Sequence, residues 1–368
     1  MSDQTPHYRP LTTGLALTPV VFLTVLLAAS VYLFGSDSSY GANQIALLLA
    51  ACVAALVGKR IGLSWHATQE GIIHGISVGL GPTLILLSVG MLIGTWILSG
   101  TVPAMIYYGV EILNPSVFYA ASAAICAIVA VSIGSSWTVA GTLGIGLMGI
   151  AGSFGLSPAI TAGAIVSGAY FGDKLSPMSD TTNLAAAATG VDLFDHIRHM
   201  LWTTVPGFTL ALLGFLLIGG GEAATPEEIA ALQTSLSQEF AIGWHLLLPL
   251  ILMLGLIYKR FPAFPSIVIS ALVGAVFAVL FQPQAVRELA GNSAELNQAA
   301  LLLQGVWISL FDGYVANSGN SFLDDLLSKG GMSSMLNTVW LIICALAFGG
   351  ALERTGILDH LLRKILQR

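Results

Sequence analysis

Charged side chains are scarce in this chain. Only 9% of its 368 residues are Asp, Glu, Lys or Arg, against roughly 25% in soluble domains. Between Gly71 and Gly172 the only formal charge is Glu111. A soluble protein of this size needs polar groups over its whole surface, so the scarcity of charge excludes a soluble fold.

Cysteine is scarce as well. The chain has three cysteines, Cys52, Cys126 and Cys344, each in an apolar stretch. We expect them to be buried small side chains rather than redox centres or metal ligands. The H-E-x-x-H motif of a membrane metalloprotease does not occur, which weighs against an intramembrane enzyme. We therefore expect no cofactor, and the formal net charge of −6 gives no reason to expect a nucleic-acid partner.

Long apolar runs take the place of charge, since 55% of the residues are hydrophobic. A bilayer-spanning helix needs about 20 mostly apolar residues, so we predict an all-α polytopic membrane protein. The first run, Leu15 to Phe34, lacks a signal-peptide cleavage site, and we expect it to be retained as a span. The predicted spans are residues 15–34, 45–57, 76–98, 202–218, 244–258, 264–281 and 336–352, with a long apolar region at 117–171 continued at 184–188.

The basic residues orient these spans, because cytoplasmic loops carry an excess of Lys and Arg. If every apolar stretch crossed the membrane, Arg198 would lie on the side opposite to Lys59. If residues 117–152 instead form a re-entrant hairpin, all basic clusters and the N-terminus are cytoplasmic, and the acidic stretches 222–239 and 288–325 are external. Non-helical backbone at membrane depth requires surrounding protein or a water-filled cavity, so the hairpin implies a cavity. The basic clusters are Lys59-Arg60, Arg198, Lys259-Arg260 and Arg363-Lys364.

This topology predicts two inverted repeats, which are typical of secondary transporters. Residues 94–102 weakly resemble residues 350–358, sharing two glycines at equal spacing. The predicted divisions are a first repeat at 1–220 (hairpin 117–152, broken helix 158–189, helix 202–218), an external acidic linker at 221–243, and a partial second repeat at 244–368. On this interpretation a C-terminal portion is missing; the alternatives are a shorter natural protein or one completed by a partner.

A first polar cluster, Gly134-Ser135-Ser136-Trp137-Thr138, lies near the middle of the predicted hairpin. Glycine and hydroxyl groups suit a tip where the backbone turns, and two helix ends there would direct free peptide groups at a ligand. A Ser/Thr-lined contact between membrane helices is an equally good interpretation.

A second polar cluster, residues 172–183, separates two apolar half-helices. Ionisable groups at membrane depth cost at least about 2.5–3.5 kcal/mol each, so three in one segment require a reason. Unwound backbone would add free carbonyls to the side-chain oxygens, and hard cations such as Na⁺ bind oxygen ligands. The alternative is a solvated loop between two short helices. The candidate Na⁺- or proton-binding side chains are Asp173, Ser176, Ser179, Asp180, Thr181, Thr182 and Asn183, with Ser135, Ser136 and Thr138 of the first cluster.

The two carboxylates have different predicted roles. Asp180, flanked by hydroxyls, is the better Na⁺ ligand. Asp173 either forms an ion pair with Lys174 or carries a proton beside a displaceable amine. A carboxylate that binds H⁺ or Na⁺, but not both, is the simplest chemical basis for antiport.

Other polar residues are weaker candidates for coupling or pH sensing. His196 and His199 share a helix face and can change charge near neutral pH, although a polar helix start explains them as well. Glu353, next to Arg354, closes the last predicted span, where an interfacial ion pair is the simpler interpretation.

With these residues identified, the chain resembles the NhaC-type sodium/proton antiporter family of the ion transporter superfamily. The Gly-Asp-Lys-Leu-Ser-Pro string at 172–177, followed by Ser-Asp-Thr-Thr-Asn at 179–183, is long and specific. The stretches 96–103, 134–138, 163–184, 196–200 and 203–206 carry the resemblance, which extends over essentially the whole chain.

The resemblance implies a hairpin and a broken helix in each half, meeting at a central cation site. It also implies exchange of cytoplasmic Na⁺ for external H⁺ at the plasma membrane. Some relatives resemble malate/lactate exchangers, so an organic-acid antiporter is one alternative. Because a C-terminal portion is expected to be missing, an inactive fragment is another. The expected partners are Na⁺, H⁺ and the lipid bilayer; a homodimer and a separate C-terminal fragment are left open.

Overall fold

The computed structural model describes residues 10–177, 179, 181–182, 185–186, 191–219, 226–259, 261–291, 296–317, 324 and 327–366. Throughout these residues the chain is helical, and its one β-type pairing is an isolated bridge between Tyr314 and Lys329. Among the described residues, seven helices are long and apolar enough to cross a membrane, or eight if one bent pair is a single span. The predicted all-α polytopic class is confirmed.

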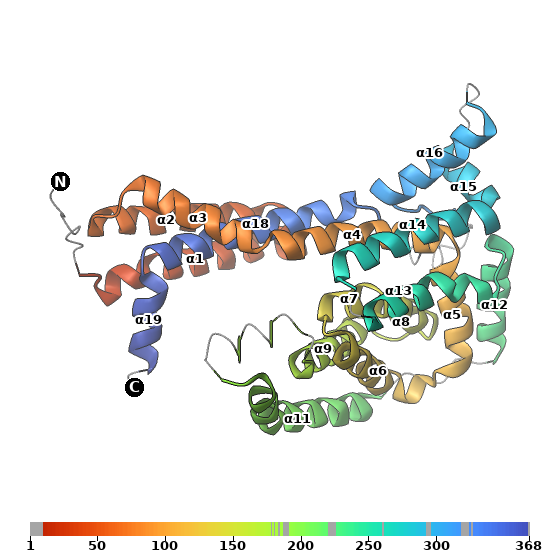
Figure 1. Cartoon of the computed structure of the whole chain (residues 1–368), viewed down its shortest axis with the longest axis horizontal. Helices are drawn as coiled ribbons and strands as arrows, with labels where there is room; N and C mark the ends of the chain where they lie inside the picture. Colours follow the sequence, from red (N-terminus) through yellow and green to blue (C-terminus); the bar gives the residue numbers. More distant parts are fainter. Residues whose placement is uncertain are drawn as a thin grey trace. The chain divides into compact units, whose positions relative to one another are not determined.

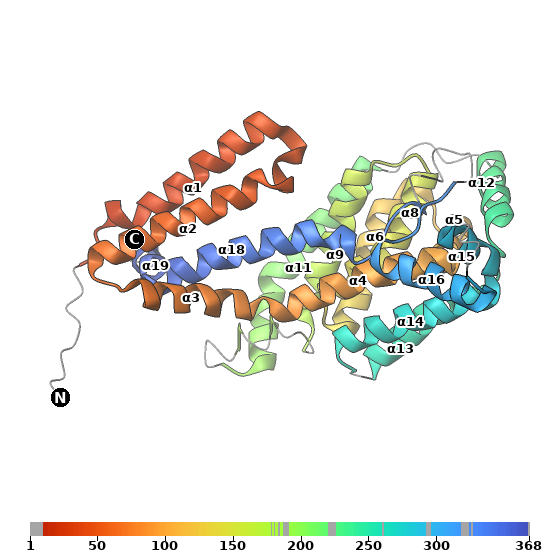
Figure 2. The same ribbon diagram turned by 90° about the horizontal axis from the view of Figure 1, so that it is seen from above.

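The chain divides into two compact units, Met1–Leu84 with Met335–Arg368, and Ile85–Ser334. In the first unit α2 and α3 both pack on α18, and α1 packs on α2 and α19 (Figures 1 and 2). Gly71 and Gly75 of α3 lie against Gly350 of α18, where a Cβ on Gly75 would come within 2.9 Å of the Gly350 Cα. These helices are α1 (Thr13–Phe34), α2 (Ala42–Ile61), α3 (Trp65–Val78), α18 (Leu336–Arg354) and α19 (Ile357–Leu366).

In the second unit α9 packs on α6, α7, α8 and α11, and α13 packs on α14 (Figure 1). The boundary with the first unit falls inside α4. The helices are α4 (Leu80–Leu98), α5 (Thr101–Ile112), α6 (Phe118–Ile133), α7 (Ser136–Gly141), α8 (Leu143–Ser153), α9 (Pro158–Leu175), α11 (Leu193–Ile218), α12 (Pro226–Glu239), α13 (Leu248–Tyr258), α14 (Ala263–Phe281), α15 (Pro283–Ala290) and α16 (Gln298–Phe311).

The crossing of α6 and α9 is unusually close because glycine lies at the contact. A Cβ on Gly168 would be 2.0 Å from the Ala123 carbonyl oxygen, and one on Gly172 would be 2.3 Å from that of Ala127. The four-residue spacing puts both glycines on one face of α9. Small residues let membrane helices approach this closely, and the crossing holds the C-terminal turn of α9 against α6.

Several predicted boundaries need correction. The predicted span 76–98 is divided between α3 and α4, and α11 begins at Leu193 rather than at residue 202. The segment expected to be acidic at 288–325 contains an apolar helix, α16, because its charged residues lie only in the flanks. The first turns of α11 are polar, so the hydropathy pattern did not include them in the predicted span. Cys126 and Cys344 are buried as expected, but Cys52 is exposed.

The first interrupted helix breaks at residues 99–100. α4 ends at Leu98, Gly100 adopts a left-handed conformation with φ 79°, and α5 begins at Thr101. A comparable interruption divides the predicted hairpin region, where α6 ends at Ile133 and Gly134 has φ 74°. A third occurs where residues 229–239 and 244–256 meet at 85°. Interrupted helices are therefore a recurring feature of the second unit.

Candidate functional site

The first polar cluster forms the break between α6 and α7. Gly134 caps α6, because its left-handed backbone costs glycine little. Ser135 is the N-cap of α7: its Oγ accepts a hydrogen bond from the Thr138 backbone N–H at 3.3 Å and lies 2.8 Å from the Thr138 Oγ1. The cluster thus supplies both helix ends, as the sequence predicted.

The second polar cluster begins where α9 ends. The helix stops at Leu175, Ser176 takes an extended conformation, and Pro177 cannot continue the helix. Thr182 donates its hydroxyl to the carbonyl oxygens of Asp173 and Lys174, at 3.3 and 3.1 Å. The Asp173 carbonyl also accepts from the Ser176 backbone N–H at 3.2 Å, and carbonyls in the last turn of a helix lack the partners of the helix interior. Thr182 therefore lies back against the end of α9.

A hydrogen bond joins the two clusters. Ser136 donates its hydroxyl to the Asp173 Oδ2 at 2.9 Å, and both side chains are buried. The two residues are 37 positions apart in the chain. They come together because α6 and α7 both pack on α9. The sequence named both residues as candidates, and the structure brings them into contact.

Further hydroxyls lie in the segment that follows α9. Ser176 and Ser179 are fully buried, Thr182 is nearly so, and the Ser179 Oγ lies 2.9 Å from the Thr181 Oγ1. Asp180 and Asn183, which belong to the predicted set, lie outside the described residues. Within the part of the chain that the structure describes, no group of three or more His, Cys, Asp or Glu side chains could hold a metal ion. Carboxylate, hydroxyl and carbonyl oxygens instead offer ligands suited to a hard cation.

Lys174 does not join the buried pair. It is exposed, and it forms no ion pair with Asp173. The predicted ion pair between Asp173 and Lys174 is therefore wrong. The other predicted role, a proton-carrying Asp173 beside a displaceable amine, stays a prediction.

The two histidines lie apart from the cluster in sequence and in structure. His196 and His199 are in the first turns of α11, after the N-cap Asp192, whose side chain accepts from the Phe194 and Asp195 backbone N–H groups. α11 packs on α9, and the Phe171 and Phe208 rings stack between the two helices with their centroids 4.0 Å apart. Their position agrees with a polar helix start, and pH sensing by these histidines stays a prediction.

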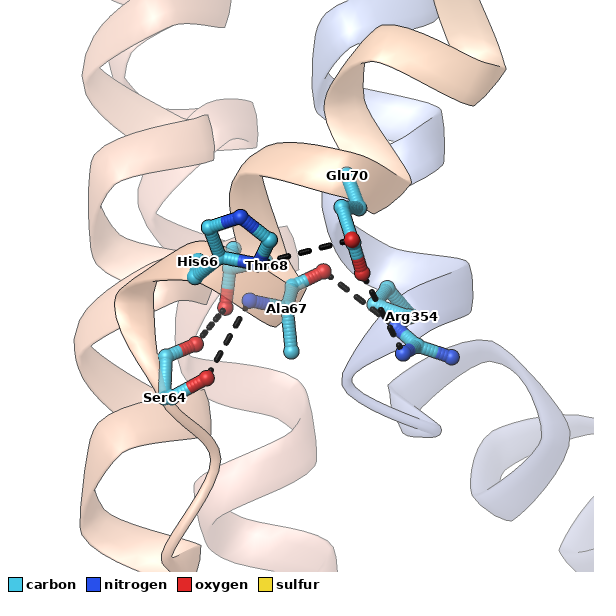
Figure 3. Close-up of polar contacts among 6 residues, drawn as sticks. All are labelled: Ser64, His66, Ala67, Thr68, Glu70 and Arg354. Atoms are coloured by element: carbon cyan, nitrogen blue, oxygen red, sulfur yellow. Dashed lines mark hydrogen bonds and ion pairs between the residues drawn. The ribbon is translucent and has the colours of Figure 1, made fainter.

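Glu353 belongs to a different polar region, in the first unit. It lines a cavity of about 470 Å³ with Glu70, His74, Arg354 and Asp359. Figure 3 shows Arg354 directed toward α3, where its Nε donates to the Ala67 carbonyl at 3.2 Å and an Nη lies 3.8 Å from a Glu70 oxygen. Sequence reasoning placed Arg354 with Glu353 and missed this contact with Glu70. Nothing in the local sequence indicates it.

The chain contains one Gly-x-Ser-x-Gly string, Gly75 to Gly79. In serine hydrolases such a string places the nucleophile on a sharp strand-to-helix turn. Here Ser77 lies in the last turns of α3 and donates its hydroxyl to the His74 carbonyl at 2.7 Å. The string is not a nucleophile elbow.

The fold and the site define a class. The described residues include many apolar helices, several of them interrupted, and a buried carboxylate that accepts a hydrogen bond from a buried hydroxyl, features typical of multi-pass membrane transporters.

The comparisons with known proteins identify the family. The model of the Na⁺/H⁺ antiporter family matches residues 168–368. The Na⁺/H⁺ antiporter NhaC of Alkalihalophilus pseudofirmus is 38% identical over 326 residues, covering 88% of this chain and 67% of that protein. The chain belongs to the Na⁺/H⁺ antiporter family.

Relatives named for other substrates are equally similar. The malate-2H⁺/Na⁺-lactate antiporter of Bacillus subtilis is 39% identical over 92% of this chain and 68% of that protein. The arginine/ornithine antiporter of Halobacterium salinarum is 35% identical over 97% of this chain and 70% of that protein. No solved structure matches the chain significantly.

Proposed function

We propose that this chain exchanges Na⁺ for H⁺ across the plasma membrane, with its cation site between α7 and the end of α9. The observation that carries the proposal is the buried hydrogen bond from Ser136 to Asp173. A carboxylate at this depth needs compensation for lost hydration, and hydroxyl groups supply it in part. The NhaC relative supports Na⁺ and H⁺ as the exchanged ions.

Competition for Asp173 provides the coupling. A protonated carboxyl carries no charge and attracts Na⁺ weakly, whereas an ionised one, with the hydroxyls of Ser136 and Ser176 nearby, forms an oxygen-lined site. Asp180 and Asn183 extend this ligand set in the sequence-based proposal. Occupancy by one ion excludes the other, so release of H⁺ on one side and binding of Na⁺ there become linked events.

Organic-acid exchange coupled to Na⁺ or H⁺ is the second candidate function. It is favoured by the similarity to the malate-2H⁺/Na⁺-lactate antiporter, which is as close as that to NhaC. The exposed amine of Lys174, adjacent to the buried Asp173, would be available to an organic carboxylate. The two candidates share the cation site and differ in whether a second substrate is required.

The deciding experiment measures Na⁺-induced proton movement in inverted membrane vesicles with a pH-sensitive dye. We expect dequenching on addition of NaCl alone, and loss of this signal in Asp180→Asn, which removes the predicted Na⁺ ligand. Dequenching that requires malate or lactate would instead establish the organic-acid function. Vesicles without the chain are the control, and an unchanged signal in Asp180→Asn would remove that residue from the site.

The topology is part of the same proposal. Residues 117–152 form a re-entrant hairpin with a cytoplasmic N-terminus, supported by the break at Gly134 and the capping by Ser135. Residues 115–132 are alone long enough to cross the membrane, so the alternative is a full crossing.

Single cysteines distinguish a hairpin from a crossing. In a chain whose own three cysteines are replaced by serine, we expect Ser116→Cys and Ser153→Cys to react with an impermeant maleimide from the same side. These positions flank the hairpin, before α6 and at the end of α8. Labelling from opposite sides would show that the segment crosses the bilayer.

A further inference from the structure

Three of the apolar helices in the first unit have an end at one cavity. Leu11 lies just before α1, Ile61 is the last residue of α2, and Thr355 directly follows α18. All three line a cavity of about 460 Å³, together with the turn that leads into α19. Since α1, α2 and α18 each qualify as membrane spans, the cavity lies at the depth where spans end, which is the boundary between lipid and water.

Two arginines line this cavity. Arg354 and Arg363 contribute to it, together with His360 and the acid Asp359. Arg354 is held by the Ala67 carbonyl and by Glu70 (Figure 3), and its guanidinium retains further donors. Arg363 forms no ion pair with any described residue. The cavity therefore presents hydrogen-bond donors with a positive charge to an anion.

The lining of the cavity also includes apolar side chains. Leu11, Ile61 and Leu63 belong to it, so a ligand that fills the cavity carries hydrocarbon next to its charge. An inorganic anion would satisfy the arginines alone. An anionic amphiphile satisfies both.

Helix α19, beside the cavity, has the features of a helix that lies at the membrane surface. α19 buries Ile357 against the first unit and leaves Leu358 and Leu362 exposed, 42% and 47%. It is tied to the start of α1, because Lys364 donates to the Thr13 Oγ1 at 2.7 Å. Exposed leucines next to basic residues are typical of helices that lie in the interface. Two further cations, Lys59 and Arg60, lie in the last turn of α2, at the same end of that helix as Ile61.

From this arrangement we propose that the cavity binds the headgroup of an anionic phospholipid. The phosphate contacts Arg363 and Arg354, and the start of the acyl chains lies along Leu11, Ile61 and Leu63. Basic pockets between membrane helices are suited to such headgroups, and the cytoplasmic leaflet is rich in anionic lipid. This site is separate from the Asp173 cluster and does not depend on which substrate is exchanged.

The test uses the full-length chain, purified in detergent, and its thermal stability. Phosphatidylglycerol, phosphatidylcholine with the same acyl chains, and inorganic phosphate are titrated in parallel. We expect saturable stabilisation by phosphatidylglycerol alone, weakened by added salt. In Arg363→Gln the half-saturating concentration of phosphatidylglycerol should rise about fivefold, the loss typical of one basic residue at an anionic surface.

Arg60→Gln is the matched control. It removes the same charge from the same end of the first unit, but Arg60 does not line the cavity, and we expect a near-unchanged titration. Equal losses in both variants would mean diffuse attraction to a basic surface and would overturn the site. Equal stabilisation by phosphatidylcholine, or full stabilisation by inorganic phosphate, would overturn the assignment to an anionic lipid. These last two comparisons use the unmutated chain, so they stand even if a variant fails to fold.

Discussion

Asp173→Asn should abolish Na⁺-dependent proton movement while leaving the protein in the membrane. The amide keeps the size of the carboxyl group but can neither carry the exchanged proton nor offer a charge to Na⁺.

Ser136→Ala should retain exchange with a weaker apparent affinity for Na⁺, because Asp173 loses the hydroxyl that donates to it at 2.9 Å. Hydrogen bonds to charged groups contribute about 1.5–3 kcal/mol, so the expected loss in affinity is about 10- to 100-fold. Dye dequenching over a range of Na⁺ concentrations measures both effects.

Ser153→Ala is the matched control for Ser136→Ala. Its hydroxyl donates to the Gly149 carbonyl of its own helix, α8, at 2.9 Å, and contacts no ionisable group in that bond. We expect its Na⁺ dependence to equal that of the unmodified chain. Exchange retained in Asp173→Asn at normal Na⁺ affinity would exclude this carboxyl from the cation site.

The second large effect concerns stability rather than transport. Gly172→Ala places a methyl group 2.3 Å from the Ala127 carbonyl oxygen and 2.6 Å from the Val131 backbone nitrogen. Both neighbours are backbone atoms of α6, so the helices must separate. Overpacking of this kind costs about 1–3 kcal/mol, and we expect a lower midpoint of thermal unfolding in detergent together with loss of exchange.

Gly163→Ala, in the same helix, is the control for that experiment. A Cβ on Gly163 meets nothing within 4 Å, and alanine is favoured over glycine in a helix interior by about 0.8–1.0 kcal/mol. The two alanine variants should therefore shift the midpoint in opposite directions. A Gly172→Ala protein as stable as Gly163→Ala would show that the close crossing of α6 and α9 is not present in the membrane.

Composition alone predicted the class of fold, because long apolar runs with little charge have few other solutions. Glycine and proline also marked the interruptions well: Gly100 and Gly134 both lie at helix ends with positive φ. Helix α16 was missed because the charges of its flanks were assigned to the whole stretch 288–325. Its own fourteen residues, Gln298–Phe311, contain no charged side chain.

Contacts between distant residues were beyond sequence reasoning. Ser136 and Asp173 were each recognised from local composition, but their hydrogen bond depends on how two helices cross. Glycines at 168 and 172 determine that crossing, and their spacing is too common to predict a partner. The contact of Arg354 with Glu70 likewise joins residues far apart in the chain, where the neighbouring Glu353 seemed the simpler partner.

The close crossing has a mechanical consequence. Gly172, which allows α6 to approach closely, is directly followed by Asp173. The contact with α6 and the Asp173 carboxyl group therefore move together. Sliding α9 along α6 by one or two residues would bring a side chain against the Ala123 and Ala127 carbonyl oxygens, where only hydrogen fits. The two helices therefore move as one body, and the Asp173 carboxyl group is fixed within it. If Asp173 binds the exchanged ion as proposed, access to the ion from either side of the membrane must change through parts that move past α6 and α9.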